Sequence, residues 1–362
     1  MKIERLAEVN TIDLSEVAHI LHIKPFRPNL LFRGHHAQTL AGYAYPRRFG
    51  LRRYLDGDEK RLFEVEPNVK LLAHCRWQPK ERQSNPTLIL VHGLEGSSDS
   101  VYLLGTAAKA FKAGFNVLRL NLRTCGGTEH LTSTLYHSGL SQDLRAVISE
   151  LICTDGLENI FLGGFSLGGN MSLKLAGELG DSAPPQLRGI CAVSPSIDLS
   201  LCATAIEQPS NWLYNRRFVS SLKKRIRRIQ RINPERYDLA DIKTVRTIRE
   251  FDACVTARYG GFRDVEDYYT RSSSLRLIKD IRIPTLIIHA HDDPFVPFDS
   301  FRHPSLAANP FVILLAPKQG GHVGFIAADT TAGNKEDRFW AENRLVEFCQ
   351  LLSVKKRLAV NS

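Results

Sequence analysis

The chain has 362 residues, 43% of them hydrophobic and 24% charged, and a formal net charge of +10 at pH 7. This composition is typical of a folded globular protein and excludes an intrinsically disordered chain. Because no stretch approaches the roughly 18 consecutive apolar residues that a membrane-spanning helix needs, we expect no such helix.

The N-terminal residues and the cysteines both indicate a cytoplasmic protein. Glu4, Glu8, Asp13 and Glu16 interrupt the apolar residues at the N-terminus, which therefore lacks the apolar core of a signal peptide. The cysteines are odd in number, widely spaced and contain no Cys-x-x-Cys pair. This pattern favours free or buried thiols in a reducing compartment over a disulfide framework or a zinc site. The cysteines are Cys75, Cys125, Cys153, Cys191, Cys202, Cys254 and Cys349.

Residues 1–60 show no regular hydrophobic period, and we expect them to form an N-terminal arm. His35 and His36 lie in this arm among aromatic and basic residues. Because adjacent side chains point in different directions in most backbone conformations, the pair is poorly arranged to bind a metal ion. A structural or hydrogen-bonding role is the simpler expectation.

From residue 61 onward, short apolar runs alternate with segments of helical periodicity. This alternation predicts an α/β protein with a mostly parallel central sheet flanked by helices. The first two strands are expected to form an antiparallel hairpin. The expected strands are 61–65, 69–77, 87–91, 116–121, 159–162, 189–193, 285–289 and 311–315. The expected helices are 101–113, 140–153, 167–179 and 337–352.

The alternation of strands and helices breaks between residues 199 and 281. This stretch has no dense apolar strand and several segments with helical periodicity. We expect a mainly helical insertion at the C-terminal edge of the sheet, where such insertions commonly act as lids. The α/β core would then consist of residues 61–198 and 282–355.

A serine lies between an expected strand and the helix that follows it. Ser166 has a glycine two positions before it and another two positions after it, which is the Gly-x-Ser-x-Gly pattern of a nucleophile elbow. The turn is so tight that the flanking positions collide unless they lack a Cβ atom, and it exposes the serine Oγ at the C-terminal edge of the sheet. We therefore expect Ser166 to be a nucleophile.

A nucleophilic serine needs a general base, and the base needs a carboxylate that orients it. Asp293 and His322 each follow one of the last two expected strands, and His322 lies in a glycine-rich loop. Serine, acid and histidine then occur in the chain order that is typical of this kind of site. Asp292 is the alternative acid, but the Asp-x-x-x-Pro spacing that ends at Pro297 favours Asp293.

The same edge of the sheet should supply backbone N–H donors for the negatively charged oxygen of a reaction intermediate. One donor is expected to be the amide of Leu167, at the start of the helix after Ser166. The other is expected to be the amide of Leu94, in the loop that begins with His92 and Gly93. His92 precedes the serine in the chain and is expected to brace this loop.

Other chemistries have weaker support in the sequence. His289 and His291 suit a shared metal ion by spacing, yet no cysteine or carboxylate cluster accompanies them. The glycines around Ser166 do not form Gly-x-Gly-x-x-Gly, and no phosphate-binding P-loop occurs, so nucleotide binding is not expected. We expect no metal ion and no organic cofactor.

Positive charge is concentrated between Asn211 and Glu250, where twelve lysines and arginines accompany four aspartates and glutamates. A helix is expected at 216–232, with apolar residues on one stripe and basic residues on most of the rest. The stripe consists of Phe218, Leu222, Ile226, Ile229 and Ile232. The basic residues are Arg217, Lys223, Lys224, Arg225, Arg227, Arg228 and Arg231.

Two interpretations of this basic helix are open. The simpler one is a helix whose apolar stripe packs on the protein and whose basic face is solvated. The alternative is contact with an anionic membrane surface or an acidic substrate, which would make the protein peripheral at a membrane. No recognition motif for nucleic acid accompanies the charge, so nucleic acid is not expected as a partner.

Motifs spread over about residues 30–350 carry a family resemblance. They are Gly34-His-His-Ala-Gln-Thr39, His92-Gly-Leu-Glu-Gly-Ser97, Asn121-Leu-Arg-Thr-Cys-Gly-Gly127, Tyr136-His-Ser-Gly139, Gly164-Phe-Ser-Leu-Gly-Gly-Asn170, Glu250-Phe-Asp252, Asp267-Tyr-Tyr269, Asp292-Asp-Pro294 and Gly321-His322. This set resembles the YheT-like branch of the α/β-hydrolase superfamily, the bacterial relatives of the animal abhydrolase-domain esterases and phospholipases. The family's Arg-Gly-Cys-Gly-Gly loop is Arg123-Thr-Cys-Gly-Gly127 here, a departure that concerns the shape of this loop.

The resemblance implies an α/β-hydrolase fold with a lid and a triad of Ser166, Asp293 and His322. It also implies carboxylic ester substrates, acylglycerols and phospholipids among them. Ser166 would attack the ester carbonyl, His322 would transfer the proton, and Asp293 would hold the imidazolium, before water releases the acyl group. Two alternatives remain: acyl transfer to an acceptor other than water, and a non-catalytic protein that binds membrane surfaces.

Overall fold

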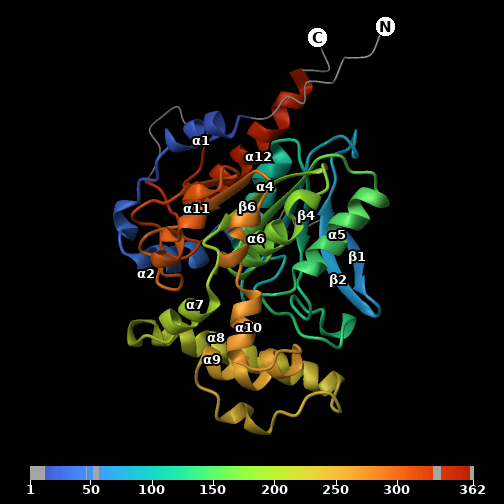
Figure 1. The fold of residues 1–362 in the computed structure, drawn as a ribbon, viewed down its shortest axis with the longest axis vertical. Coiled ribbons are helices and arrows are strands. Elements are labelled where there is room, and N and C mark those ends of the chain that lie inside the picture. The colour runs from blue at the N-terminus through green and yellow to red at the C-terminus, as the bar shows by residue number, and fades with distance from the viewer. Residues whose placement is uncertain (1–12, 46, 52–56, 329–335, 359–362) are drawn as a thin grey trace.

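The computed structural model describes residues 13–45, 47–51, 57–328 and 336–358. Residues 1–12, 46 and 52–56 of the expected N-terminal arm lie outside the described residues. A central sheet runs through the molecule, with helices on both of its faces and a cluster of helices at one end (Figure 1).

The sheet has eight strands in the order β1-β2-β4-β3-β5-β6-β7-β8. β1 and β2 form an antiparallel hairpin, β2 pairs antiparallel with β4, and the remaining pairings are parallel. The predicted hairpin and the predicted, mostly parallel sheet are therefore confirmed. The strands are β1 (Glu59–Glu66), β2 (Val69–Arg76), β3 (Thr87–Val91), β4 (Asn116–Leu120), β5 (Ile160–Phe165), β6 (Leu187–Val193), β7 (Thr285–Ile288) and β8 (Val312–Leu315).

β5 is longer than the sequence predicted. The expected strand ended at residue 162, but the ladder continues because Gly163 pairs with Leu90 of β3 and Cys191 of β6. β5 thus reaches Phe165 and delivers the chain directly to Ser166. Gly163 and Gly164 therefore belong to the strand, directly before the turn at Ser166.

Helices cover both faces of the sheet. On one face, α4 (Val101–Lys112) packs against α12 (Trp340–Leu358), and α1 (Leu14–His22) packs against α12. On the other face, α5 (Ser141–Cys153) packs against α6 (Leu167–Leu179). The sequence predicted the last helix from residue 337, but Asp337 accepts a hydrogen bond from the Phe339 N–H (3.1 Å) in a turn before the helix begins.

The remaining short helices connect these layers. They are η1 (Leu30–Phe32), α2 (His35–Ala44), α3 (Arg48–Leu51), η3 (Glu129–Leu131), η4 (Gly180–Ser182), η9 (Phe298–Arg302) and α11 (Pro304–Ala308).

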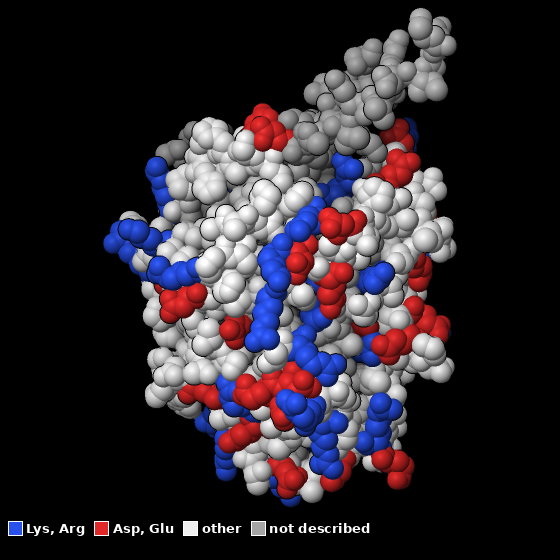
Figure 2. Space-filling model, in the orientation of Figure 1, with Lys and Arg blue, Asp and Glu red and all other residues white. Residues whose placement is uncertain are grey.

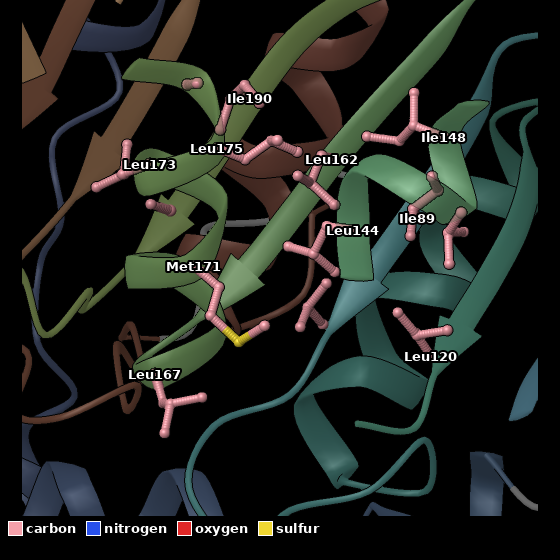
Figure 3. Packing of buried hydrophobic residues seen from close by; sticks show 14 of the residues in the cluster. Ile89, Leu120, Leu144, Ile148, Leu162, Leu167, Met171, Leu173, Leu175 and Ile190 are labelled. Atoms are coloured by element: carbon pink, nitrogen blue, oxygen red, sulfur yellow. The ribbon is translucent and has the colours of Figure 1, made fainter. Parts of the chain in front are cut away.

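The hydrophobic core has one cluster on each face of the sheet, because successive strand side chains point to opposite faces. Ile89 and Val91 of β3 join the cluster under α5 and α6, whereas Leu88 and Leu90 join the cluster under α4 and α12. Figure 3 shows part of the first cluster, in which Leu175 of α6 lies beside Leu162 of β5 and Ile190 of β6. This packing fixes α6, and with it the residue at its start.

Between β6 and β7 the chain forms only helices and turns. We call residues 199–280 the helical segment, and Figure 1 shows its helices α7 to α10 gathered beyond one edge of the sheet. The segment has a hydrophobic cluster of its own, to which α8 contributes Val219, Leu222, Ile226 and Ile229. Its elements are α7 (Leu199–Ile206), η5 (Pro209–Asn211), α8 (Trp212–Ile232), η6 (Ala240–Lys243), α9 (Ile248–Phe251), η7 (Asp252–Ala257), α10 (Val265–Ser272) and η8 (Leu275–Asp280).

The basic helix is longer than predicted and most of its apolar stripe is covered. α8 begins at Trp212 rather than at residue 216, because the 3-10 turn η5 leads directly into it. Ile226 and Ile229 are fully buried, but Ile232, which the sequence placed on the same stripe, is 51% exposed. Figure 2 shows basic and acidic side chains interspersed on this face of the molecule, including the part where the helical segment lies.

The cysteines and the apolarity of the helices agree with what the sequence predicted. All seven cysteines are free thiols, and five of them are buried. No helix in the part of the chain that the structure describes combines the length and apolarity needed to cross a bilayer.

Candidate active site

Ser166 lies in a strained turn between β5 and α6. Its φ of +53° and ψ of −118° are outside the regions that residues with a side chain prefer. A Cβ atom at Gly164 would overlap the Gly168 carbonyl, and one at Gly168 would lie 2.6 Å from the Val91 carbonyl oxygen. Only glycine fits at both positions, as expected for a nucleophile elbow. Such strain is typical of functional sites.

The three residues expected to form a triad lie in one chain of hydrogen bonds. The Ser166 hydroxyl donates to His322 Nε2 (2.9 Å), and His322 Nδ1–H donates to Asp293 Oδ2 (2.8 Å). In this arrangement the neutral imidazole holds its proton on Nδ1, which leaves the Nε2 lone pair to accept the serine proton. The geometry therefore allows general-base activation of Ser166.

Asp293 is held by the backbone as well as by the histidine. Its Oδ1 accepts hydrogen bonds from the N–H groups of Phe295 (2.8 Å) and Val296 (3.0 Å). Burial alone raises the pKa of this carboxyl, but the neighbouring His322 and the Phe295 N–H outweigh burial, so the pKa lies below its ordinary value. Asp293 is therefore ionised at neutral pH and can stabilise an imidazolium.

Asp292 takes a different position. Its Oδ1 accepts a hydrogen bond from the Gly321 N–H (2.9 Å), whereas the imidazole of His322 bonds to Asp293. Gly321 has a φ of +59°, and a Cβ atom there would lie 2.5 Å from the His35 carbonyl oxygen, so the position requires glycine. Asp292 thus fixes the loop that carries the histidine.

Helix α2 braces this histidine loop, a contact that the sequence did not predict. Thr39 Oγ1 accepts a hydrogen bond from the His322 N–H (2.9 Å) and donates to the His35 carbonyl (2.8 Å). Gln38 is fully buried, donates to the Ile326 carbonyl (3.1 Å) and accepts from the Ile326 N–H (2.7 Å). Both residues belong to the Gly34–Thr39 motif, so the motif was a usable signal for them.

Replacing Thr39 with valine tests this bracing. The His322 N–H would lose its acceptor at nearly constant side-chain volume, so we expect kcat to fall about 10-fold, since an unpaired buried donor costs about 1–3 kcal/mol. Thr106→Val in α4 is the matched control, because Thr106 also donates to the carbonyl four residues earlier, that of Tyr102 (2.7 Å). Steady-state kinetics of both variants measure the effect; equal losses of kcat would contradict a role for Thr39 at the histidine.

The sequence predicts the backbone amides of Leu94 and Leu167 as oxyanion donors, and the structure places both residues at the cavity of Ser166. Both residues line the cavity that contains Ser166, and among the described residues neither amide N–H has a hydrogen-bond acceptor. A Cβ atom at Gly93 would lie 3.0 Å from the Ser166 Cβ, so the Leu94 loop runs against the nucleophile. Two unpaired N–H groups in this position suit a developing negative charge.

His92 braces the Leu94 loop, as the sequence analysis expected. It is fully buried, its Nδ1–H donates to the Gly93 carbonyl (2.7 Å), and its Nε2 accepts from the Leu122 N–H (3.1 Å). Burial lowers the pKa of this imidazole to about 4, so it is neutral under ordinary conditions. Its two hydrogen bonds fix the end of β3 to the end of β4.

The expected solvent-facing position of Arg225 is wrong. This arginine of α8 is buried, its guanidinium contacts Glu95 Oε1 (Nε–Oε1 2.7 Å) and lies 4.5 Å above the Tyr136 ring. It also donates to Thr124 Oγ1 (3.0 Å). Thr124, which stands where the family loop has glycine, has a φ of +62°. Arg225 faces inward because it pairs with Glu95, which follows Leu94 in the chain.

Removing this guanidinium should destabilise the protein. In Arg225→Met, the Glu95 carboxylate, whose side chain is only 11% exposed, would lose its cation, so we expect the free energy of unfolding to fall by about 3–5 kcal/mol. Arg228→Met is the control: Arg228 pairs with Glu129 (2.7 Å), but its side chain is 54% exposed, so a loss below about 1 kcal/mol is expected. Denaturant unfolding measures both, and similar losses would contradict the assignment.

Ser166 and His322 line a cavity of about 660 Å³, its open mouth included. The helical segment supplies much of its lining, with Leu199, Ile206, Phe218, Leu222 and Ile248 among the apolar residues. A mostly apolar lining with a few polar groups is typical of small-molecule sites. The cavity suits a substrate with an apolar part next to the reacting bond.

The histidines that sequence reasoning set aside have structural contacts. His289 is buried, stacks on Phe301 at 3.9 Å between ring centroids, and its pKa is lowered to about 4 by burial. His36 stacks on Tyr214 of α8 at 5.6 Å. No group of three or more potential metal ligands occurs in the described ranges of the chain.

Comparisons with known proteins agree with this architecture. A model of the alpha/beta hydrolase family matches residues 88–333. The protein named Putative esterase YheT from Escherichia coli (strain K12) is 31% identical over 345 residues, which cover 95% of this chain and 97% of that protein. Phospholipase ABHD3 from Mus musculus is 30% identical over 247 residues, which cover 68% of this chain and 60% of that protein.

A solved structure shows the same fold at lower sequence similarity. The esterase Pf2001 from Pyrococcus furiosus superposes with a TM-score of 0.52 at 18% identity, over 83% of this chain and 94% of that chain. At this identity the likeness concerns the fold, and the function must be argued from the site.

Proposed function

Because this chain belongs to the alpha/beta hydrolase family and to its YheT-like branch, we propose that it cleaves carboxylic esters through an acyl-enzyme formed on Ser166. Family and named relatives support a carboxylic ester hydrolase as the class of enzyme. The observation that carries the mechanism is the hydrogen-bonded chain from Ser166 through His322 to Asp293 at the wall of an apolar cavity.

Each residue has a defined part in the proposed reaction. Ser166 Oγ attacks the ester carbonyl carbon while its proton passes to His322 Nε2. The carbonyl oxygen becomes negatively charged and accepts hydrogen bonds from the amides of Leu94 and Leu167. His322 then gives the proton to the leaving alcohol, and the ester is replaced by an acyl group on Ser166.

The second half of the reaction repeats these roles. Water enters, loses a proton to His322 Nε2 and attacks the acyl carbonyl, after which Ser166 recovers the proton and the acid is released. Asp293 keeps the imidazole in the orientation and tautomer that both halves need. We propose that the helical segment acts as a lid that supplies the apolar side of the cavity and favours esters with an apolar acyl chain.

A fluorophosphonate probe tests the nucleophile directly. Such probes form a covalent bond to an activated serine, so wild-type protein is expected to carry one label, located by peptide mass spectrometry on Ser166. Heat-denatured protein is the control, because the hydrogen bond to His322 is lost on unfolding. Absence of a label on the native protein would contradict the proposed hydrolase activity.

We also propose that the protein contacts anionic membrane surfaces, though not through the stripe that the sequence suggested. Trp212 and Leu213 at the start of α8 are more than half exposed, as are Leu40 and Tyr43 of α2. The guanidinium of Arg217 lies 4.5 Å above the ring of Tyr43. Helices α2 and α8 therefore share this surface. Exposed apolar side chains beside arginines suit an interface with anionic lipid.

Vesicle co-sedimentation tests this surface. Binding to anionic vesicles is expected to exceed binding to neutral ones and to weaken with salt, and Leu213→Asp is expected to reduce it about 10-fold. Leu62→Asp is the control, because Leu62 of β1 is 47% exposed and lies at the far edge of the sheet. Equal weak binding to both vesicles, or equal effects of both variants, would remove the membrane proposal.

A further inference from the structure

One lining residue of the catalytic cavity is acidic and has no part in the triad. Asp252, at the start of η7, is the acidic residue among the described residues that line the cavity with Ser166 and His322. η7 is a π-helix, a rare form that occurs frequently at functional sites. The position of Asp252 in the cavity and the π-helical backbone at Asp252 are independent observations, and both indicate a functional role.

Two hydroxyl groups hold the Asp252 carboxylate in place. Thr256 Oγ1 donates to Oδ1 (2.6 Å), and Tyr269 Oη donates to Oδ2 (3.0 Å). A carboxylate offers about four acceptor positions, so each oxygen retains capacity for a further donor. The side chain is partly exposed, and it lines the cavity. It is therefore an oriented acceptor with room for a group on the substrate.

The ionised carboxylate weakens the fold at this position. Burial raises the pKa of Asp252 from 3.8 to about 6, against the effect of its hydrogen bonds and of Arg249. Because the folded-state pKa is above the unfolded value, the contribution of Asp252 to stability is largest below about pH 4 and is lost as the pH rises through 6. A charge that reduces stability inside a substrate cavity is typical of a binding role.

We propose that Asp252 forms a polar subsite that accepts a hydrogen bond from a hydroxyl group on the substrate. The inference rests on the proposed ester hydrolysis and adds the substrate class: an ester that carries a hydroxyl group in addition to its apolar chain. A neutral hydroxyl fits better than a cation, because the Arg249 guanidinium already lies near the carboxylate, 5.1 Å above the Tyr269 ring. Thr256 and Tyr269 position Asp252 through their hydroxyl groups.

Matched esters test the subsite. Each pair has the same size and differs in one group, a hydroxyl or a methyl ether, placed in the alcohol part in one pair and at the acyl chain end in the other. For wild type we expect kcat/KM to favour the hydroxyl compound about 10- to 100-fold in one pair, as a hydrogen bond to a charged acceptor allows. In Asp252→Ala the preference should fall to about one, and in Asp252→Asn to an intermediate value.

Asp241→Asn is the control for the change in charge, because Asp241 is exposed in the same helical segment and does not line the cavity. It should keep the wild-type preference. A merely structural Asp252 would lower kcat/KM equally for both esters of a pair. In addition, Asp252→Asn is expected to raise Tm at pH 8 and to change it little at pH 4, whereas a structural role predicts a lower Tm at both.

Fluorophosphonates with the same hydroxyl or methyl ether groups separate the two proposals. If Ser166 is labelled at equal rates by both members of each pair, the subsite is wrong and the proposed hydrolase remains. If wild type carries no label at all, the proposed hydrolase is wrong and the subsite falls with it. A faster label from the hydroxyl probe that is lost in Asp252→Ala supports both.

Discussion

Ser166→Ala is expected to lower kcat by about 10⁶-fold, because the alanine variant has no atom that can attack the ester or carry the acyl group. The histidine and the aspartate cannot compensate, since both act through the serine. A residual rate of about 10³-fold over the uncatalysed reaction would come from the Leu94 and Leu167 amides and from binding in the cavity. Initial rates on a chromogenic ester at high enzyme concentration measure both quantities.

The fold of Ser166→Ala should be unaffected, so a loss of kcat can be assigned to the missing hydroxyl. Alanine keeps the Cβ atom at a φ of +53°, so the strain of the turn remains. Ser166→Gly, by contrast, relieves this strain and should stabilise the protein by about 1 kcal/mol while losing the same activity. Ser196→Ala is the control, because Ser196 also lines the cavity, whereas His322 Nε2 bonds to Ser166. A Ser166→Ala variant with near wild-type activity would exclude the acyl-enzyme.

The central sheet and the residues at its edge could be predicted because local patterns determine them. Dense apolar runs such as Thr87–Val91 can be satisfied only in a buried strand, and the glycines around Ser166 have few roles other than a tight turn. Chain order then limited the base to His322 and the acid to Asp292 or Asp293, and the spacing to Pro297 favoured Asp293. The structure brings these three residues together, and their catalytic roles remain a prediction that the variants test.

Features that depend on distant segments could not be predicted. Nothing in the local sequence of α8 indicates that Arg225 turns inward, because its partner Glu95 is 130 positions away in the chain. The contact of Thr39 with His322 spans 283 positions and is equally invisible to periodicity. In both cases a hydrogen bond to a polar group far away in the chain, and not the periodicity of the helix, determines where the side chain lies.

Asp293→Asn is expected to lower kcat by about 10⁴-fold with little change in KM. The asparagine can still accept hydrogen bonds from Phe295 and Val296 through Oδ1, so its amide nitrogen would face His322 Nδ1. Two donors cannot pair, and the imidazole would move its proton to Nε2 in order to accept from the amide. His322 would then present a proton, instead of a lone pair, to the Ser166 hydroxyl.

The neighbouring acid provides the decisive comparison. Asp292→Asn makes the same chemical change one residue earlier, but an asparagine Oδ1 can still accept from the Gly321 N–H, so kcat should fall less than about 10-fold. Fluorophosphonate labelling rates should follow the same order as kcat, because both depend on proton removal from Ser166. A larger loss in Asp292→Asn than in Asp293→Asn would show that the carboxylate on His322 Nδ1 is not the one that sets its tautomer. The role of Asp293 then would be limited to holding the loop through its two backbone N–H partners.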